Sequence, residues 1–249
     1  MNFAQNPNFY LRLAGVAYLA NIALGLFGET VVRGTLVVAG DAAATAANIA
    51  NSPGLWRAGI GGDLLMQLLD IPLIVLFYLL LKPVHHGLAI TATLFNIVQT
   101  SVLAVNKLAL VAPLLLLAPA AQAAMPAELL AQLTAFWVKM HSHGFGIGLI
   151  FFGVTCIIRG YLIVKSEFLP AFLGYLLIAA GVCYISNSFL LLLAPHIAGL
   201  FFPWILLPCL VGELAITLWF LCCGLKTKAW QAKLNSPLVQ GQVAAVLAK

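Results

Sequence analysis

Long runs of apolar residues alternate with short polar segments along almost the whole chain. Six of these runs approach or exceed the roughly 18 residues that a helix needs to cross a bilayer. They lie at residues 9–32, 56–81, 88–117, 136–164, 169–193 and 201–225. The segments between them carry the proline, glycine and polar residues typical of turns. The pattern predicts an all-α fold, a polytopic transmembrane helix bundle with about six spans.

The segments outside the apolar runs are short, so no separate soluble domain is expected. Residues 1–8 form a short N-terminus, residues 9–225 a six-helix transmembrane domain, and residues 226–249 a basic tail. The first run follows no basic region and precedes no convincing cleavage site, which favours a retained helix over a signal peptide. The longest connection, residues 34–55, contains an alanine-rich stretch. We expect a short helix there, capped by Asp41 and ended by Pro53 and Gly54.

The basic residues predict the orientation in the membrane, because the cytoplasmic side of a membrane protein carries an excess of lysine and arginine. With the N-terminus inside, eight basic residues fall on or near the cytoplasmic side and three fall on the other. Those three are Arg33, Arg57 and Lys139, while Lys107 lies within a span. Both termini are therefore expected to be cytoplasmic. The connection 34–55 is then an outer loop, with its helix lying across the outer face as a lid or rim.

Composition agrees with a lipid environment and narrows the partners. Of the 249 residues, 63% are hydrophobic and only 8% are charged, whereas soluble domains carry about 25% charged residues. The net charge of +5 comes from basic residues at the ends of apolar runs. The expected partner is therefore the lipid bilayer, and no nucleic acid is expected to bind. Three of these residues, Arg12, Lys82 and Arg159, are interpreted as interfacial anchors that extend toward the membrane surface. The five cysteines form no CxxC pair and are interpreted as small apolar residues.

Ionisable side chains inside the spans indicate where function resides. A charge at mid-bilayer costs at least about 2.5–3.5 kcal/mol, so such groups face the bundle interior or a water-filled cavity. At about 1.5 Å of rise per residue, five candidates converge on the outer boundary and two lie deeper. The five are Glu29, Asp63, Lys107, His143 and Asn187, the two are Asp70 and Glu213, and Gln67 shares the helical stripe of Asp63 and Asp70. Together they predict a polar funnel that opens to the outside and binds a ligand.

Helical periodicity adds a prediction of which side chains face the funnel. Asn96, Gln99, Thr100, Leu103, Asn106 and Lys107 share one side of the third span. On the fourth span Lys139 and His143 share a face, and His141 lies on the opposite one. We expect His143 to point toward Asp63 and Glu29, and His141 to be a packing or interfacial residue. Pro72 and Pro208 are expected to kink their helices beside Asp70 and Glu213.

Each feature also has a structural interpretation. Amide stripes often hold helices together, and the acids with Lys107 and Lys139 could form ion pairs that serve stability alone. His141, His143 and His196 could form a zinc-like set with Asp63 or Glu29. However, histidines two residues apart on a helix point in different directions, and the sequence contains no HExxH motif. No metal and no cofactor is therefore expected.

Six segments, in order along the chain, resemble a known family. They read "RLAGVAYLANIALGLFGE", "VRGTLVVAGDAAATAANI", "RAGIGGDLLMQLLDI", "HGFGIGLIFFG", "LPAFLGYLLIAAGVCY" and "GELAITLWFLCCG". From about residue 11 to residue 224 the chain resembles the bacterial membrane family catalogued as domain of unknown function 4386. The resemblance implies a multi-pass protein of the bacterial cytoplasmic (inner) membrane and implies no reaction. Glu29, Asp63, Asp70, His143 and Glu213 lie on the matching segments.

Two classes of function follow, with a third beside them. The first is a protein that binds or transports a small polar or amphipathic ligand through the outward cavity, as intramembrane acids beside broken helices do in transporters. The second is a membrane-embedded enzyme for a lipid-like substrate, with Asp63 or Asp70 as base and His143 as acid or metal ligand. The third is a structural or accessory membrane subunit. The sequence favours binding or transport.

Overall fold

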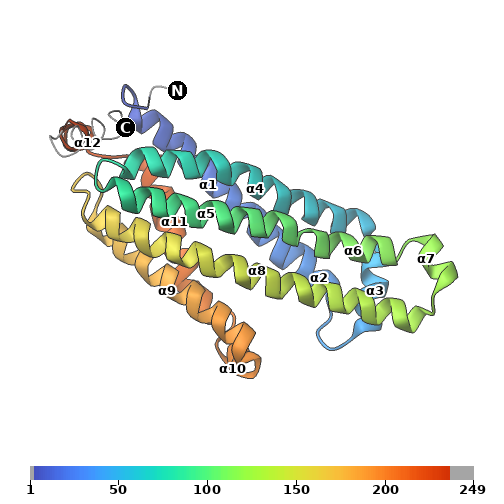
Figure 1. Cartoon of the computed structure of the whole chain (residues 1–249). Helices are drawn as coiled ribbons and strands as arrows, with labels where there is room; N and C mark the ends of the chain where they lie inside the picture. Colours follow the sequence, from blue (N-terminus) through green and yellow to red (C-terminus); the bar gives the residue numbers. More distant parts are fainter. Residues whose placement is uncertain (1–2, 236–249) are drawn as a thin grey trace, which may run out of the picture. The chain divides into compact units, whose positions relative to one another are not determined.

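The computed structural model describes residues 3–235, and every regular element within them is a helix (Figure 1). Six helical segments of this part of the chain are long and apolar enough to cross a membrane. They are Pro7–Leu36, Pro53–Leu81, His86–Leu116, Ala127–Val164, Ala171–Leu193 and Trp204–Cys222. The predicted all-α fold with six membrane-spanning helices is confirmed, and the chain is a multi-pass membrane protein.

The first and third spans are interrupted, whereas the second, fourth and fifth are continuous. The first consists of α1 (Pro7–Leu26), the π-helix η1 (Phe27–Arg33) and α2 (Gly34–Leu36), and the third of α5 (His86–Asn106) and α6 (Leu108–Leu116). The others are α4 (Pro53–Leu81), α8 (Ala127–Val164), α9 (Ala171–Leu193), and the 3-10 turn η2 (Trp204–Leu206) with α11 (Leu207–Cys222). Four short helices connect or follow them: α3 (Ala42–Asn51), α7 (Pro119–Ala124), α10 (Pro195–Phe201) and α12 (Thr227–Leu234).

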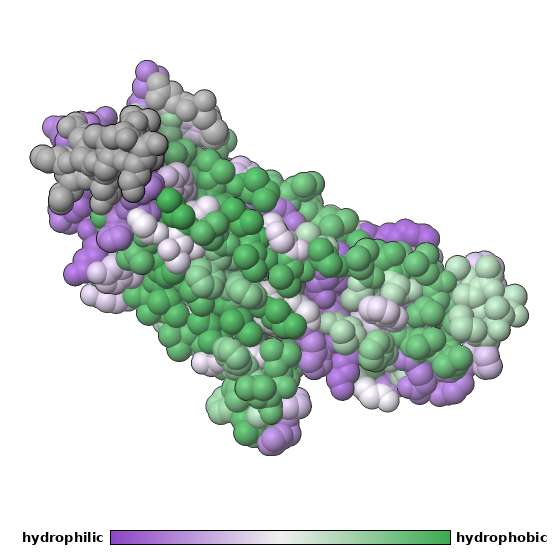
Figure 2. Space-filling model, in the orientation of Figure 1, coloured by the Kyte–Doolittle hydropathy of each residue, from purple (hydrophilic) through white to green (hydrophobic). Residues whose placement is uncertain are grey.

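The surface of the helices is apolar in the way that lipid requires. Large side chains such as Leu68 and Leu193 are exposed, the latter to 78%. Figure 2 shows hydrophobic residues over most of the visible face, with hydrophilic residues gathered in patches. Apolar surface in water costs about 25 cal/mol per Å², and lipid removes that cost.

The chain divides into two compact units, and α1, α4, α5 and α8 contribute residues to both. Unit 1 contains the described residues of 1–19, 71–99 and 149–249, and unit 2 contains residues 20–70 and 100–148.

Helices α8 and α9 approach each other closely in unit 1. A Cβ atom added at Gly160 would lie 2.5 Å from the carbonyl oxygen of Gly174, and one at Gly181 would lie 2.5 Å from that of Gly153. Because only glycine leaves room for this approach, two glycine pairs bring the two backbones together.

The ends of the described chain also pack within unit 1. Trp230 of α12 is fully buried and its Nε1 donates to the carbonyl oxygen of Leu80 (3.2 Å). The backbone N–H of Leu225 donates to Asn8 Oδ1 (2.9 Å). The predicted basic tail therefore begins as a packed helix, and its residues 236–249 lie outside the described residues.

Unit 2 has an apolar core of its own, centred on Trp56. Trp56 packs with Val32, Ile49, Leu110 and Val138, and its indole N–H donates to the carbonyl oxygen of Leu110 (2.8 Å). The predicted short helix is α3, and it docks on this core through the fully buried Ile49.

The predicted start of the short helix is confirmed, whereas its predicted end differs in detail. Asp41 Oδ1 accepts from the N–H of Ala44 (2.8 Å), which confirms the cap. Pro53 does not simply end α3, since α3 stops at Asn51 and Pro53 is the first residue of α4. Proline fits that first position because its missing N–H has no partner there in any helix.

The prediction of a kink at Pro208 is wrong. Pro208 lies in the first turn of α11, where no intrahelical hydrogen bond is lost. Pro72, in contrast, lies in the interior of α4, two residues after Asp70.

Candidate functional site

Two irregular stretches of backbone in unit 2 face the second span and define the candidate site. The first span changes from α1 to the π-helix η1 at Phe27, and the third span breaks at Lys107, between α5 and α6. The N–H of Lys107 bonds to the carbonyl of Ala104, three residues back (3.2 Å). Single π-helical turns and such breaks occur frequently at functional sites.

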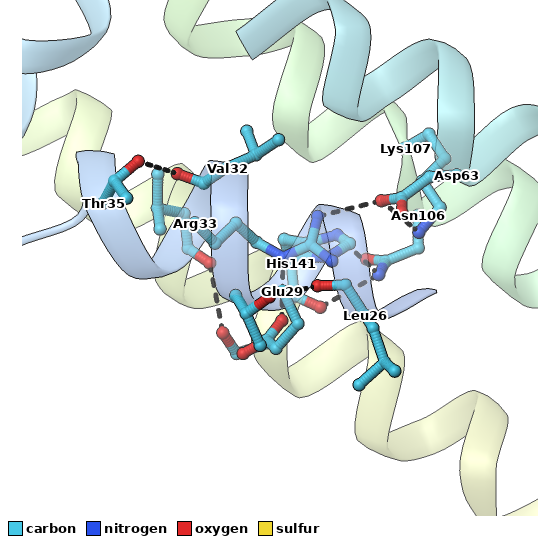
Figure 3. Close-up of polar contacts among 12 residues, drawn as sticks. Leu26, Glu29, Val32, Arg33, Thr35, Asp63, Asn106, Lys107 and His141 are labelled. Atoms are coloured by element: carbon cyan, nitrogen blue, oxygen red, sulfur yellow. Dashed lines mark hydrogen bonds and ion pairs between the residues drawn. The ribbon is translucent and has the colours of Figure 1, made fainter. Parts of the chain in front are cut away.

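Asp63 of α4 is the centre of this site. Its side chain is only 2% exposed, and a single oxygen, Oδ2, accepts from both Lys107 Nζ and Arg33 Nη1 at 3.0 Å each. Figure 3 shows the two cationic groups approaching the carboxylate from different helices. The interrupted spans thus each deliver one positive charge to one buried acid.

Arg33 links the buried acid to an exposed one. Its Nε donates to Glu29 Oε2 (2.9 Å), one π-helical turn earlier in η1. The Glu29 side chain is 62% exposed, whereas that of Arg33 is 13% exposed. We call Glu29, Arg33, Asp63 and Lys107 the Asp63 cluster. Its four formal charges sum to zero, but only Glu29 is open to the surroundings.

Gly28 makes the approach of Arg33 to Asp63 possible. A Cβ atom there would lie 2.7 Å from Asp63 Oδ1 and 2.9 Å from Arg33 Nη2. On the other side, Lys107 Nζ lies 5.6 Å from the centre of the Phe145 ring. This is a cation–π distance that adds to the stability of the buried ammonium group.

Asn106 and His141 extend the cluster toward α8. Asn106 Nδ2 donates to the carbonyl oxygen of His141 (2.9 Å) and to its ring Nδ1 (3.0 Å). The carbonyl can only accept, so the Asn106 atom is the amide nitrogen and His141 Nδ1 carries no proton. His141 is buried and within electrostatic reach of Lys107, Arg33 and Asp63 (Figure 3). Gly144 gives Asn106 the space that a side chain would fill.

The predicted facing of the two histidines is therefore wrong. His143 is partly exposed, and its Nδ1 bonds to the carbonyl of Lys139 on its own helix (2.9 Å). With Phe136, Lys139 and Met140 it lines a surface hollow of about 290 Å³. The separation into two faces was correct, but the face of His141 and Gly144 is the one that packs inward. Glycine on that face lets α5 come close, whereas the other face presents Lys139 and large side chains.

A second polar group lies further along α4 in unit 2. Asp70 accepts from Asn21 Nδ2 (2.8 Å) and from the hydroxyl of Thr100 (3.1 Å). Gln67, between the two acids, is buried and donates weakly to the carbonyl of Asp63 (3.4 Å). Among the described residues, Gln67 Oε1 and Asn21 Oδ1 are buried acceptors without a hydrogen-bond partner. The stripe predicted on the second span thus lies inside the protein.

The remaining candidates belong to unit 1. Glu213 of α11 accepts a short hydrogen bond from the hydroxyl of Tyr184 on α9. Asn187 is half-buried on α9, next to the fully buried Ser188. Arg159, expected as an interfacial anchor, is instead buried, with its guanidinium carbon 4.2 Å above the Phe77 ring. An aromatic face can take the place of water for a guanidinium group.

Two surface hollows of unit 2 are lined by residues outside the Asp63 cluster. One is the hollow at His143, and the other, of about 460 Å³, is lined by α3 with residues from 117 to 131. The side chains around Asp63 pack against one another instead. Within residues 3–235, no three His, Cys, Asp or Glu side chains lie together as a metal site would require.

Sequence reasoning missed three members of this site: Arg33, Asn106 as a partner of His141, and His141 itself. Arg33 was interpreted as an outer-loop charge because it follows the apolar run directly. The signal that identifies it is its spacing from Glu29, since acidic and basic residues four apart on a helix are neighbours.

Comparison with known proteins gives the family. A family model described as Domain of unknown function (DUF4386) matches residues 13–224. A protein of Archaeoglobus fulgidus, described as "Uncharacterized protein", is 29% identical over 133 residues, which are 53% of this chain and 65% of that protein. The aligned part thus spans less than two thirds of that relative. No solved structure matches the chain. This multi-pass membrane protein therefore belongs to the family of the domain of unknown function DUF4386.

Proposed function

We propose that the protein binds a small polar or amphipathic ligand at the Asp63 cluster and transports it across the membrane. One observation carries the proposal. A carboxylate that is 2% exposed accepts from two cationic groups, and each of these comes from a span whose helix is interrupted beside it.

Energetics support a functional role for these charges. A buried ion pair is rarely more stable than apolar residues of the same size, because desolvation offsets the attraction. Inside a membrane such groups are expensive and mark ligand or ion pathways. Since two cations share one oxygen of Asp63, either can turn to a ligand while the other keeps the carboxylate neutralised. Interrupted helices next to intramembrane charges are how many transporters bind their substrates.

Binding is tested most directly with matched charge-neutralising variants. We expect ligands that raise the melting temperature of the purified wild type to raise it much less in Asp63→Asn, and to be taken up by proteoliposomes only with wild-type protein. The control is Glu128→Gln, an exposed acid on α8 whose partner is Gln132. The size of the ligand-induced shift is compared, because Asp63→Asn also lowers the starting value. Equal shifts in Asp63→Asn and Glu128→Gln would contradict the proposal.

The proposal includes an orientation and a location. Both termini are cytoplasmic, as the distribution of basic residues favours, and the membrane is the bacterial inner membrane, as the family resemblance implies. Arg33 is ion-paired with Asp63 and Glu29, so its charge does not weaken that distribution. A cysteine at position 43 (Ala43→Cys) should react with an impermeant maleimide in intact cells, and one at position 87 (Gly87→Cys) should not. The exposed Cys222 and Cys223 are first replaced by serine, and the opposite labelling pattern would reverse the orientation.

A further inference from the structure

We infer that the group recognised by the Asp63 cluster is the carboxylate of a small amphipathic monoanion, which replaces Glu29 on Arg33. The inference rests on the proposed function and specifies its ligand class. It follows from the charge of the buried groups, from the geometry of Arg33 and from the surface beside Glu29.

The buried part of the cluster has one positive charge too many. Arg33 and Lys107 supply two cations and Asp63 supplies one anion, and their side chains are 13%, 5% and 2% exposed. His141 adds no charge, because its Nδ1 accepts from Asn106. Glu29 neutralises the excess from a position that is 62% exposed. An anion at the place of the Glu29 carboxylate would neutralise it equally well.

Arg33 presents the geometry that a carboxylate prefers. A guanidinium group binds a carboxylate with two parallel N–H donors of one edge. Arg33 Nη1 donates to Asp63, and Nε, which belongs to the other edge of the guanidinium group, donates to Glu29 (2.9 Å). A Cβ at Gly28 would lie only 2.9 Å from Nη2, so glycine leaves room beside this nitrogen. In our inference a second carboxylate oxygen binds there.

Glu29 occupies this edge as a weak, tethered competitor. An ion pair with an exposed partner contributes little to stability, so a free carboxylate can displace Glu29 at little cost in binding free energy. Leu26 and Val31 on the same segment are exposed apolar residues. They provide a surface for the apolar part of the ligand, which favours an amphipathic monoanion over an inorganic one.

Three probes of equal length separate charge from hydrophobicity: hexanoate, hexylamine and hexanol. We expect isothermal titration of the protein in a nonionic detergent to show hexanoate binding at least about tenfold more tightly than the other two. Glu29→Gln removes the competitor and should tighten hexanoate binding about two- to fivefold, the equivalent of an exposed ion pair. Arg33→Lys keeps the charge but loses the two-donor edge, and should weaken binding about tenfold or more. Glu128→Gln, the control, should bind as the wild type does.

The outcomes distinguish this inference from the proposed function. Two results would overturn the carboxylate inference. In one, hexanoate binds neither the wild type nor Glu29→Gln. In the other, it binds the wild type and Arg33→Lys equally well. Weaker binding to Glu29→Gln than to the wild type also overturns it, because Glu29 would then be a ligand partner. If hexylamine or hexanol instead binds and depends on Asp63, the proposed function stands with another ligand class. The proposed function itself fails only when ligands of every charge bind without regard to Asp63.

Discussion

The Asp63 cluster of unit 2 and the Glu213–Tyr184 pair of unit 1 both hold an acid within apolar helices, but in opposite ways. Asp63 accepts from two cations on two interrupted spans. Glu213 accepts from the neutral hydroxyl of Tyr184, whose ring packs 5.5 Å from that of Phe152. We propose that the first arrangement exchanges partners, whereas the bond from Tyr184 ties α9 to α11.

The glycines of the two regions repeat this difference. In unit 1 an added Cβ at Gly160 or Gly181 would meet backbone oxygens, which cannot move without separating the helices. In unit 2 an added Cβ at Gly28 would meet the ends of the Asp63 and Arg33 side chains. We therefore expect the α8–α9 contact of unit 1 to be rigid and the Asp63 cluster of unit 2 to be adjustable.

The largest effect is expected from Gly160→Leu in unit 1. The new side chain must push α9 away, because its Cβ lies 2.5 Å from the Gly174 oxygen. A typical overpacked site costs about 1–3 kcal/mol of stability, and the loss here should be larger. Size-exclusion chromatography should therefore yield little monodisperse protein. Gly61→Ala, at a helical glycine with nothing within 4 Å, is the control and should behave as the wild type. Normal folding of Gly160→Leu would show that the glycine contact is not rigid.

Asp63→Asn should have the next largest effect. It leaves Arg33 and Lys107 buried without their carboxylate, and removing one partner of a buried pair costs about 3–5 kcal/mol. Thermal unfolding in detergent measures the loss. Adding Lys107→Met should restore part of the stability, because the one remaining cation still contacts Glu29. A double variant no more stable than Asp63→Asn would mean that Asp63 stabilises the fold independently of Lys107.

Tyr184→Phe should cost less and leave binding intact. The ring contact with Phe152 is kept, while the hydrogen bond to Glu213 is lost. A single hydrogen bond contributes about 0.5–1.5 kcal/mol, so the melting temperature should fall and hexanoate affinity should not change. A change in affinity at constant stability would give the Glu213 region a part in function and remove the distinction between the two regions.

The smallest effect on stability, and the sharpest test, is expected from Gly28→Ala. Alanine gains about 1 kcal/mol of helix propensity over glycine, which offsets part of the cost of shifting the ends of the Asp63 and Arg33 side chains. The melting temperature should therefore fall only slightly, while hexanoate binding falls because the Arg33 edge is covered. The reverse result, lost stability with unchanged binding, would make the Asp63 cluster as rigid as the α8–α9 contact.

Several features of the structure were predictable from the sequence. The six spans follow from apolar length, and the cap of α3 by Asp41 follows from local chemistry. Asp63 and Gln67, which the helical period assigned to one stripe, are both buried. What failed was the choice between the two faces of α8, because His141 and His143 are equally polar and the period gives only their separation.

The sequence by itself thus determined the solvent, the helices and the relative facing of residues within each helix, since these depend on neighbours a few positions apart. Only the tertiary structure decided that Arg33 and Lys107 meet on one oxygen of Asp63, that His141 packs inward, and that Glu213 pairs with Tyr184. Those contacts depend on the rotation of each helix about its axis and on how closely glycines let the backbones approach. Both are set by packing between segments that are distant in the sequence, and no local pattern records them.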